Sequence, residues 1–367
     1  MNILIVTTHL RTGGITRYVY NLAKGLKQSG HDVWVASSGG LWEESLKEAG
    51  VQCLEIPLNT KSIVSPRVFR SFLTLRRFLK TQPMDLIHCN TRVSQFLGFL
   101  LWKFTKTPYV CTFHGYYKPR WSRRILKCGG NRTVAISRSV AEHLSGDLGI
   151  DSRGIRVVYN GVDLKGYNVK LPRDEIRRKY QISGSPVIGI VARLSAEKNH
   201  AILIRAFQRL LRDYPDAVLL IAGAGRLERE LKRFVERLGL AERVIFLRDV
   251  AIPNVFAVLD VFVLASIKEG FGFAVVEAQL VGIPVIVSSA GGIKELVQDK
   301  VTGLVLRDNK NADELCDGIK LLLKDVRLRT EMVSRAREYA REMFSLEKMI
   351  EGMLRVYGEI AGKNEIS

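Results

Sequence analysis

The sequence lacks any long hydrophobic run. Its longest apolar stretches, such as Phe96–Trp102, which ends at Lys103, are far shorter than the roughly 20 residues that a membrane-spanning helix needs. The start of the chain also lacks a basic leader followed by a short apolar segment and a small-residue cleavage site. We therefore expect a cytoplasmic protein that does not cross a membrane.

Paired cysteines and metal-ligand spacings are missing as well. The five cysteines are an odd number and include no C-x-x-C pair, and Cys53, Cys89 and Cys111 lie in apolar, strand-like runs. This distribution indicates free, buried thiols in a reducing compartment. Because no spacing of His and Cys is typical of a zinc site, the sequence predicts no metal and no cofactor.

The glycine pattern of dinucleotide-binding proteins is also absent. The segment Thr12-Gly13-Gly14-Ile15 follows the first predicted strand and opens a helix, but it does not have the G-x-G-x-x-G spacing. No acidic residue ends the second predicted strand, where Ala36–Gly40 stands instead. These features argue against a nicotinamide enzyme and leave Gly13 and Gly14 as a possible phosphate-binding turn.

Basic residues, in contrast, are abundant. The chain has 367 residues, with 56 Lys and Arg against 37 Asp and Glu, and a formal net charge of +19. Residues 1–165 hold 24 of the basic and 10 of the acidic side chains, so most of the excess lies in the first half. Such a field favours an anionic partner: nucleic acid, nucleotide phosphates or anionic lipid headgroups.

Short β-branched runs alternate with longer amphipathic segments along the whole chain. The first set of predicted strands is Asn2–Val6, Val33–Ala36, Gln52–Ile56, Asp85–Cys89, Tyr109–Thr112, Thr133–Ile136 and Arg156–Tyr159. The second set is Pro186–Val191, Ala217–Ile221, Val244–Leu247, Asp260–Ala265 and Pro284–Ser288. Repeated strand-then-helix order predicts parallel sheets with helices on both faces. The fold class expected is therefore α/β, with two doubly wound domains.

We place these domains at residues 1–168 and 169–344, since the length is sufficient for two cores. The last helical pattern, about 345–367, comes after the second sheet should be complete, and we expect it to pack back on the first domain.

A glycine-rich loop between a predicted strand and a helix is the strongest local signal. It runs from Glu269 through Gly270, Phe271, Gly272 and Phe273 to Glu277. The carboxyl end of a parallel strand opens into the ligand crevice, and the backbone N–H groups of the following helix point at it. Two carboxylates there could accept hydrogen bonds from the hydroxyls of a sugar.

A second signal places basic residues at another strand end. The segment from Arg193 to Asn199 follows a strand and is expected to begin a helix capped by Ser195. A fork-shaped Arg193 and a point-charge Lys198 could neutralise a diphosphate leaving group. His114 and the turn Asn160–Asp163 follow further predicted strands of the first domain, where a polar group could face a ligand.

Together these segments resemble glycosyltransferase family 4, the retaining enzymes of GT-B fold, in which two Rossmann-like domains face a central cleft. The resemblance lies in an E-x7-E element at Glu269 to Glu277, an R…EKN element at Arg193 and Lys198, an NGVD turn at Asn160–Asp163, a PVI…GG…E segment from Pro284 to Glu295, and the glycine loop at Gly13 and Gly14.

The resemblance implies a role for each of these residues. It places the donor diphosphate on Arg193 and Lys198, the ribose on Glu277, and the donor sugar on Glu269 and the backbone around Phe271–Phe273. Gly13, Gly14 and Asn160 complete the expected donor-binding set. His114 is expected beside the reacting sugar, so the expected catalytic residues are His114, Glu269, Arg193 and Lys198.

The activity implied is transfer of a hexose-type sugar from a nucleoside diphosphate donor, a UDP-sugar above all, to a glycan or lipid-linked acceptor. Cell-surface polysaccharide or lipopolysaccharide synthesis is the pathway class expected. In this pattern the donor's own leaving phosphate deprotonates the acceptor, so neither paired carboxylates nor a metal ion is needed. Two alternatives stay open: a sugar-nucleotide epimerase of the same fold, and a basic nucleic-acid-binding protein.

Two basic and aromatic segments of the first half predict docking on an anionic membrane surface. One is the Pro-started helical segment Ser65–Lys80, with Phe69 on it, and the other is Tyr116–Lys127, just after His114. Aromatic rings and basic side chains in such segments favour the level of the lipid headgroups. This predicts peripheral attachment to the inner face of the cell membrane.

Overall fold

The computed structural model describes residues 1–361 apart from 12, 120–127 and 164–170. It divides the chain into two compact units. Unit 1 comprises Met1–Val162 and Ser345–Ser367, and unit 2 comprises Asp163–Phe344. The predicted boundary between residues 168 and 169 lies outside the described residues.

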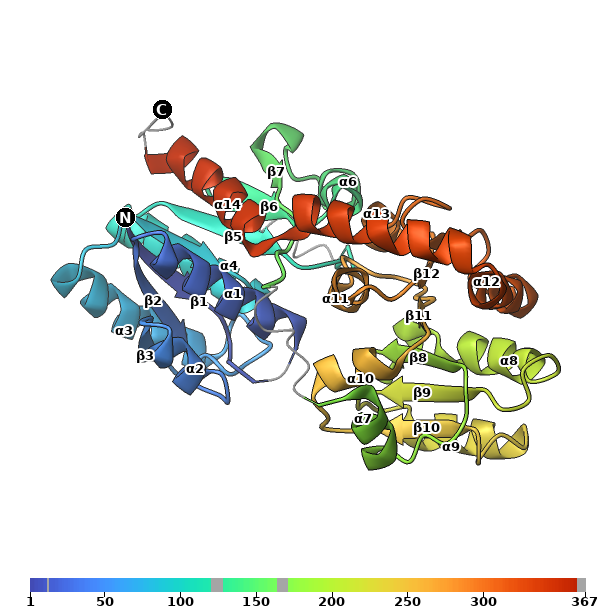
Figure 1. The fold of residues 1–367 in the computed structure, drawn as a ribbon. Helices are drawn as coiled ribbons and strands as arrows, with labels where there is room; N and C mark the ends of the chain where they lie inside the picture. The colour runs from blue at the N-terminus through green and yellow to red at the C-terminus, as the bar shows by residue number, and fades with distance from the viewer. Residues whose placement is uncertain (12, 120–127, 164–170, 362–367) are drawn as a thin grey trace. The chain divides into compact units, whose positions relative to one another are not determined.

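Unit 1 is built on a seven-stranded parallel sheet with the order β3-β2-β1-β4-β5-β6-β7 (Figure 1). Its strands are β1 (Asn2–Val6), β2 (Asp32–Ser37), β3 (Gln52–Glu55), β4 (Leu86–Cys89), β5 (Tyr109–Phe113), β6 (Arg132–Ala135) and β7 (Ile155–Val157). Ile3 of β1 is in register with Val33 on one side and Leu86 on the other. Every residue of β4 and β5 is buried, so both faces of the sheet are covered.

The helices of unit 1 show the capping chemistry that their sequences specify. They are α1 (Gly14–Gln28), α2 (Glu43–Glu48), α3 (Pro66–Thr81), α4 (Arg92–Thr105), α6 (Arg138–Gly146) and α14 (Leu346–Ala361), with a short 3₁₀ turn η1 (Ser152–Gly154). Ser65 accepts a hydrogen bond from the Arg67 amide and Pro66 opens α3. Thr91 and Ser94 form a reciprocal capping box at the start of α4.

The C-terminal helix α14 is an integral part of unit 1. Its buried face includes Met353 and Tyr357, and it packs on α1, where Gly25 leaves room for Ile350. At its far end the Glu359 carboxylate accepts hydrogen bonds from two arginines at the start of β6 and in β7, Arg132 at 2.7 Å and Arg156 at 2.8 Å. This helix is separated in sequence from the rest of the unit by all of residues 163–344, and it thereby fastens the outer strands.

Unit 2 repeats the same winding on a six-stranded parallel sheet of order β10-β9-β8-β11-β12-β13. Its strands are β8 (Val187–Val191), β9 (Val218–Ala222), β10 (Val244–Leu247), β11 (Val261–Leu264), β12 (Val285–Ser288) and β13 (Leu304–Leu306). Its helices are α7 (Arg173–Lys179), α8 (His200–Leu210), α9 (Glu228–Arg237), α10 (Ile252–Val258), α11 (Phe273–Val281), α12 (Ala312–Lys324) and α13 (Val326–Phe344), with 3₁₀ turns η3 (Ala196–Lys198) and η4 (Gly291–Leu296).

The expected class, two doubly wound α/β domains, is confirmed. In each sheet the first strand of the unit lies in the interior, third from one edge, and the chain winds outward from it to one side and then to the other. The points of reversal lie between β1 and β4 in unit 1 and between β8 and β11 in unit 2. In open sheets of this kind ligands bind beyond the carboxyl ends of the strands at this reversal point. No helix in the described part of the chain is both long and apolar enough to cross a membrane.

Candidate active site

In unit 2, two residues of opposite charge meet at the reversal point of the sheet. Lys198 ends the turn after β8, and Glu269 lies in the loop after β11, the neighbouring strand. Lys198 Nζ donates to Glu269 Oε2, and the two side chains are only 18% and 16% exposed. Ser266 Oγ lies 3.4 Å from the same carboxylate oxygen. The structure therefore brings a largely desolvated cation and carboxylate together where a ligand of the sheet would sit.

The turn that carries Lys198 differs from the expected helix start. Residues Ala196–Lys198 form a single 3₁₀ turn whose N-cap, Ser195, makes no capping hydrogen bond with its side chain. Asn199 then adopts a left-handed conformation (φ 54°), and α8 begins only at His200. The prediction that Ser195 caps a continuous helix is therefore wrong, because the left-handed residue separates the turn from the helix. Asn199 Nδ2 donates to the Asn309 carbonyl (2.8 Å), which fixes this reversal.

The loop from Glu269 to Phe273 is fixed by η4, the 3₁₀ turn that follows β12. The Gly292 amide donates to the Glu269 carbonyl at 2.9 Å. Gly272, with φ 109°, precedes the first residue of α11 in a conformation that side chains rarely adopt. The amides of Phe273 and the residues after it are thus presented at a helix N-terminus, where an anion is favoured.

Phe271 and Glu277 of this segment are buried within unit 2. Phe271 is 2% exposed and packs edge-on against Phe273 and Phe344, with ring centroids 5.4 and 5.7 Å apart. Glu277, in α11, is also only 2% exposed. The buried ring of Phe271 therefore anchors the loop to unit 2, whereas the Glu269 side chain and the loop backbone are the parts that a ligand could contact.

Arg193 is exposed and lies two residues after β8. The loop after β9 packs closely against it, since the Leu194 amide donates to the Ala224 carbonyl at 3.0 Å. A Cβ at Gly223 would collide with the Ala192 carbonyl, and Gly223 has φ +145°, so only glycine fits this approach. The close backbone approach holds Arg193 at the carboxyl edge of the sheet, two residues beyond the end of β8.

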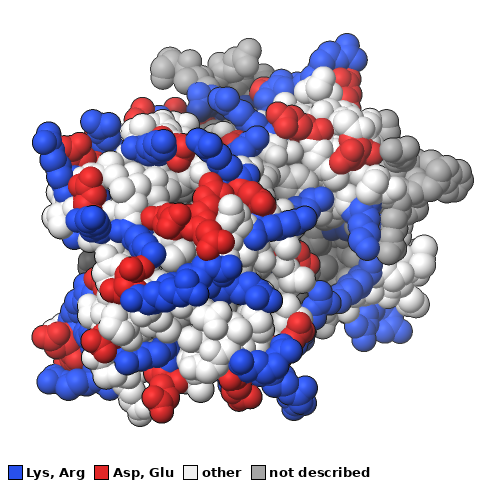
Figure 2. All heavy atoms as spheres, turned by 90° about the vertical axis from the view of Figure 1, so that its right-hand side faces the viewer, with Lys and Arg blue, Asp and Glu red and all other residues white. Residues whose placement is uncertain are grey.

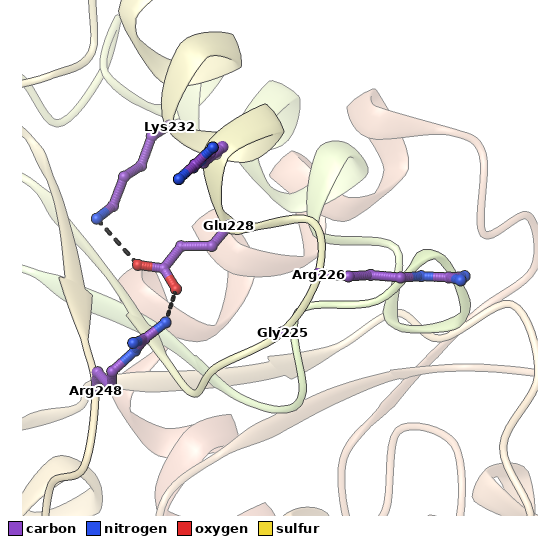
Figure 3. A pocket seen from close by; sticks show the side chains of 6 residues that line it. Gly225, Arg226, Glu228, Lys232 and Arg248 are labelled. Atoms are coloured by element: carbon purple, nitrogen blue, oxygen red, sulfur yellow. Dashed lines mark hydrogen bonds and ion pairs between the residues drawn. The ribbon is translucent and has the colours of Figure 1, made fainter.

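A basic pocket lies beside this edge, at the ends of β9 and β10. It encloses about 530 Å³ and is lined by Gly225, Arg226, Glu228, Arg229, Lys232 and Arg248. Figure 3 shows the Glu228 carboxylate between Lys232 and Arg248, which donate to it at 3.1 and 2.5 Å. Hydrogen bonds from these two cations lower the pKa of Glu228. The pocket's acidic group is thus already neutralised, while Arg226 points away from it (Figure 3).

One face of unit 2 carries both basic and acidic side chains. On the face that Figure 2 shows, which carries α8, α9 and α12, lysine and arginine side chains are interspersed with aspartate and glutamate. Several of these form ion pairs, such as Lys320 with Asp213 and Arg209 with Asp313. Surface pairs of this kind are worth little individually, but they leave no broad basic face here for a polyanion.

In unit 1, polar groups gather at the carboxyl ends of β1, β4 and β5. His114 follows β5, and its Nε2 lies 3.2 Å from Oδ1 of Asn90, which follows β4. The ring of Tyr18, on α1, packs edge-on against His114 with centroids 4.6 Å apart. Burial lowers the pKa of His114 to about 3, so the imidazole is neutral at physiological pH.

The orientation of Asn90 sets the tautomer of His114. Asn90 Nδ2 donates to the His88 carbonyl at 3.5 Å, so its Oδ1 faces His114 and accepts a hydrogen bond from Nε2–H. The proton of the neutral imidazole then resides on Nε2, which leaves Nδ1 as the acceptor. A neutral histidine held in this way can orient a hydroxyl group by accepting its hydrogen bond.

The remaining expected site residues also lie in unit 1. Gly13, with φ 139°, directly precedes α1, and Gly14 begins this helix at the loop after β1. Asn160 follows β7 and is 2% exposed, and its Oδ1 has no hydrogen-bond partner among the described residues. The structure thus groups Lys198 with Glu269 in unit 2, and His114 with Asn90 and Tyr18 in unit 1.

Sequence patterns did not reveal three of these contributors. Asn90 and Tyr18 reach His114 from different elements, and Ser266 reaches Glu269 from the end of β11. Asn90 does follow a predicted strand, which was the one available signal. Tyr18 was hidden because it lies within the apolar face of a helix, where an aromatic residue is ordinarily core.

Comparison with known proteins points to one family of enzymes. The sequence model described as Glycosyltransferase Family 4 matches residues 12–165, and the one described as Glycosyl transferases group 1 matches residues 172–342. An uncharacterized glycosyltransferase of Methanocaldococcus jannaschii is 27% identical over 94% of this chain and 94% of its own length. The UDP-Gal:alpha-D-GlcNAc-diphosphoundecaprenol alpha-1,3-galactosyltransferase of Escherichia coli is 28% identical over 71% of this chain and 72% of its own length.

Solved structures share the complete fold. A glycosyltransferase from Rickettsia africae superposes with a TM-score of 0.87 at 25% identity, covering 99% of both chains. Anabaena HepE, solved with UDP-glucose, superposes with a TM-score of 0.84 at 23% identity, covering 99% of this chain and 100% of its own. Two doubly wound units with a glycine loop, a basic turn and an acidic loop define a glycosyltransferase of GT-B fold. The chain belongs to glycosyltransferase family 4.

Proposed function

We propose that this glycosyltransferase transfers a hexose from a nucleoside diphosphate sugar, with retention of configuration and without a metal ion. The observation that carries the proposal is the Lys198–Glu269 pair at the reversal point of unit 2, beside the N-terminus of α11. A cation and a helix N-terminus there suit a diphosphate, and a carboxylate beside them suits sugar hydroxyls. A bound donor would replace this pair by separate contacts to phosphate and to sugar.

The roles proposed for the other residues are those that the resemblance to family 4 implies. Arg193 and Lys198 stabilise the charge that develops on the leaving diphosphate, a task that a metal ion performs in other transferases. Glu277 holds the ribose, and the leaving phosphate takes the proton of the attacking hydroxyl. Gly13, Gly14, Asn160 and neutral His114 act from unit 1, where His114 orients a hydroxyl of the reacting sugar through Nδ1.

The donor proposed is a UDP-hexose, and the acceptor a glycan or a lipid-linked saccharide of cell-surface polysaccharide or lipopolysaccharide synthesis. Support comes from the name of the Escherichia coli relative, which specifies UDP-Gal and a diphosphoundecaprenol acceptor. The family assignment favours transfer over the epimerase and nucleic-acid alternatives.

Transfer of a labelled sugar tests this function. With a panel of UDP-hexoses and lipid-linked acceptors, we expect a labelled product whose anomeric configuration is that of the donor. Glu269→Gln, which keeps size but removes the charge, lowers kcat/KM by about 100-fold or more. The control Glu228→Gln, in the basic pocket, leaves transfer near the parent level. Inversion of the anomeric centre, or full activity of Glu269→Gln, contradicts the proposal.

Docking on an anionic membrane accompanies this function in the proposal. In α3, Phe69 is 60% exposed, and on the neighbouring helix α4 Phe104 is 56% exposed. Phe72 packs against Phe104 with ring centroids 5.3 Å apart, and the Arg76 guanidinium lies 5.7 Å from the Phe104 centroid. Exposed rings flanked by cations suit the headgroup level of an anionic bilayer. Of the second predicted segment, Tyr116–Lys127, residues 120–127 lie outside the described residues.

Co-sedimentation with vesicles tests the docking. The parent is expected to bind anionic and not neutral vesicles, more weakly at higher salt. The variant Phe69→Ser, Arg76→Ser, Phe104→Ser loses most of this binding. A matched variant on unit 2, Leu321→Ser with Lys324→Ser, retains it. Equal sedimentation of both variants refutes docking through α3 and α4.

A further inference from the structure

A buried chain of hydrogen bonds runs through unit 1 from its last helix to its first. Tyr357 OH, on α14, lies 2.6 Å from His88 Nδ1 on β4. His88 Nε2 lies 2.7 Å from Thr112 Oγ1 on β5, and Thr112 Oγ1 lies 3.1 Å from Tyr18 OH on α1. The chain ends at the Tyr18 ring, which packs edge-on against His114 with an interplanar angle of 71°. Four elements far apart in sequence thus converge on His114.

The chain is buried and carries no net charge. His88, Thr112 and Tyr357 are fully buried, and Tyr18 is 1% exposed. Burial, with a smaller contribution from the neighbouring His114, lowers the pKa of His88 to about 3, and burial raises the pKa of both tyrosines. The groups therefore keep one protonation state across the physiological range. A neutral imidazole has one donor and one acceptor nitrogen, and here each of them meets a hydroxyl.

Such a network is rigid because every member needs its neighbours. A buried polar group that loses its partner keeps the cost of desolvation, so alternative orientations of the four side chains are unfavourable. The Tyr18 ring is consequently held at one angle against His114. The backbone carbonyl of His88 contributes as well, because it accepts a hydrogen bond from Asn90 Nδ2 and so directs Asn90 Oδ1 towards His114 Nε2. His88 is thus the junction from which both neighbours of His114 are fixed.

We propose that Tyr357 is a positioning residue for the transfer reaction, acting through His88, Thr112 and Tyr18 on the orientation of the His114 ring. The proposal rests on the role proposed above for His114. It gives α14 a part in catalysis besides its packing on unit 1, since the helix supplies the hydroxyl that anchors the chain.

The first test is Tyr357→Phe, which removes one hydroxyl and keeps the ring. We expect kcat to fall about tenfold, because a small misplacement of a group at the reacting centre is costly. The KM for the donor should change by less than about twofold, because the diphosphate contacts lie in unit 2. The control is Val356→Ala on the same helix. This buried side chain contributes packing alone, so the variant loses stability and keeps the parent kcat.

The second test combines Tyr357→Phe with His114→Ala. If Tyr357 acts through His114, its substitution lowers kcat no further once His114 is absent. The ¹⁵N chemical shifts of the His114 ring should also change in Tyr357→Phe and stay unchanged in Val356→Ala.

Three results would overturn the inference. If Tyr357→Phe lowers kcat tenfold both in the parent and in the His114→Ala background, Tyr357 acts by another route. A kcat of Tyr357→Phe equal to that of Val356→Ala shows that it contributes stability alone. An unchanged kcat in the single variant His114→Ala refutes the role of His114 itself, and the positioning proposal with it, while the donor site in unit 2 still stands on Lys198 and Glu269.

Discussion

His200 makes unit 2 sensitive to acid. It begins α8, is 2% exposed, and neither ring nitrogen has a hydrogen-bond partner among the described residues. Burial, and secondarily the charge of Lys198, lower its pKa to about 4. A histidine in the unfolded chain titrates near pH 6.5. Because the folded pKa is the lower one, the unfolded state binds more protons between these values, and the free energy of unfolding falls as the pH falls from 6.5 towards 4.

The magnitude follows from the two pKa values. Between pH 7 and pH 5, His200 alone should lower the free energy of unfolding of unit 2 by about 2 kcal/mol. His200→Leu replaces the ring by an apolar side chain of similar size and removes the titration. We therefore expect the pH 7 to pH 5 loss to be smaller in this variant by that amount. Ile202→Val, a buried change on the same helix, should cost the same at both pH values.

Urea unfolding measures this difference. All four tryptophans lie in unit 1, at positions 34, 42, 102 and 121. Tryptophan fluorescence therefore follows the unfolding of unit 1 alone, while circular dichroism follows the unfolding of both units. A change in circular dichroism that occurs without a change in tryptophan fluorescence therefore reports the unfolding of unit 2. An equal loss between pH 7 and pH 5 in the parent and in His200→Leu would refute the assignment of acid sensitivity to His200.

Three further predictions concern the donor edge of unit 2. Gly223→Ala should destabilise by at least about 2 kcal/mol in urea unfolding, because its Cβ collides with the Ala192 carbonyl, whereas Gly318→Ala in α12 should be neutral or stabilising. Arg193→Lys should lower kcat/KM at least about tenfold, because a point charge cannot replace a bidentate guanidinium, and Arg226→Lys should not. Turnover should persist in excess chelator, and its loss there would contradict a metal-free transfer.

The strands of both sheets were predictable because their sequences strongly favour a buried strand over other secondary structure. Continuous β-branched runs such as Val187–Val191 suit strands covered on both faces, and every predicted run corresponds to an observed strand. β13 was missed because Leu304–Leu306 is only three residues long and follows a turn with no periodic pattern. Its place at the sheet edge depends on pairing with β12, which no local signal encodes.

The site was predictable in its positions and not in its contacts. Lys198 and Glu269 could be placed at adjacent strand ends because parallel topology aligns those ends. Their ion pair could not be predicted, since it depends on the left-handed conformation of Asn199, which changes the direction of the chain before α8. The chain from Tyr357 to His114 was equally invisible, because it joins residues separated by up to 269 positions in sequence.

The central claim is that the Lys198–Glu269 site binds the diphosphate of a sugar nucleotide. Thermal unfolding with a panel of nucleoside diphosphate hexoses tests it most directly, because a ligand that binds only the folded state raises Tm. We predict that UDP-hexoses raise the Tm of the parent and of Lys324→Met, an exposed control, and do not raise that of Lys198→Met. Equal stabilisation of Lys198→Met and the parent, or no stabilisation of the parent by any sugar nucleotide, would contradict the account.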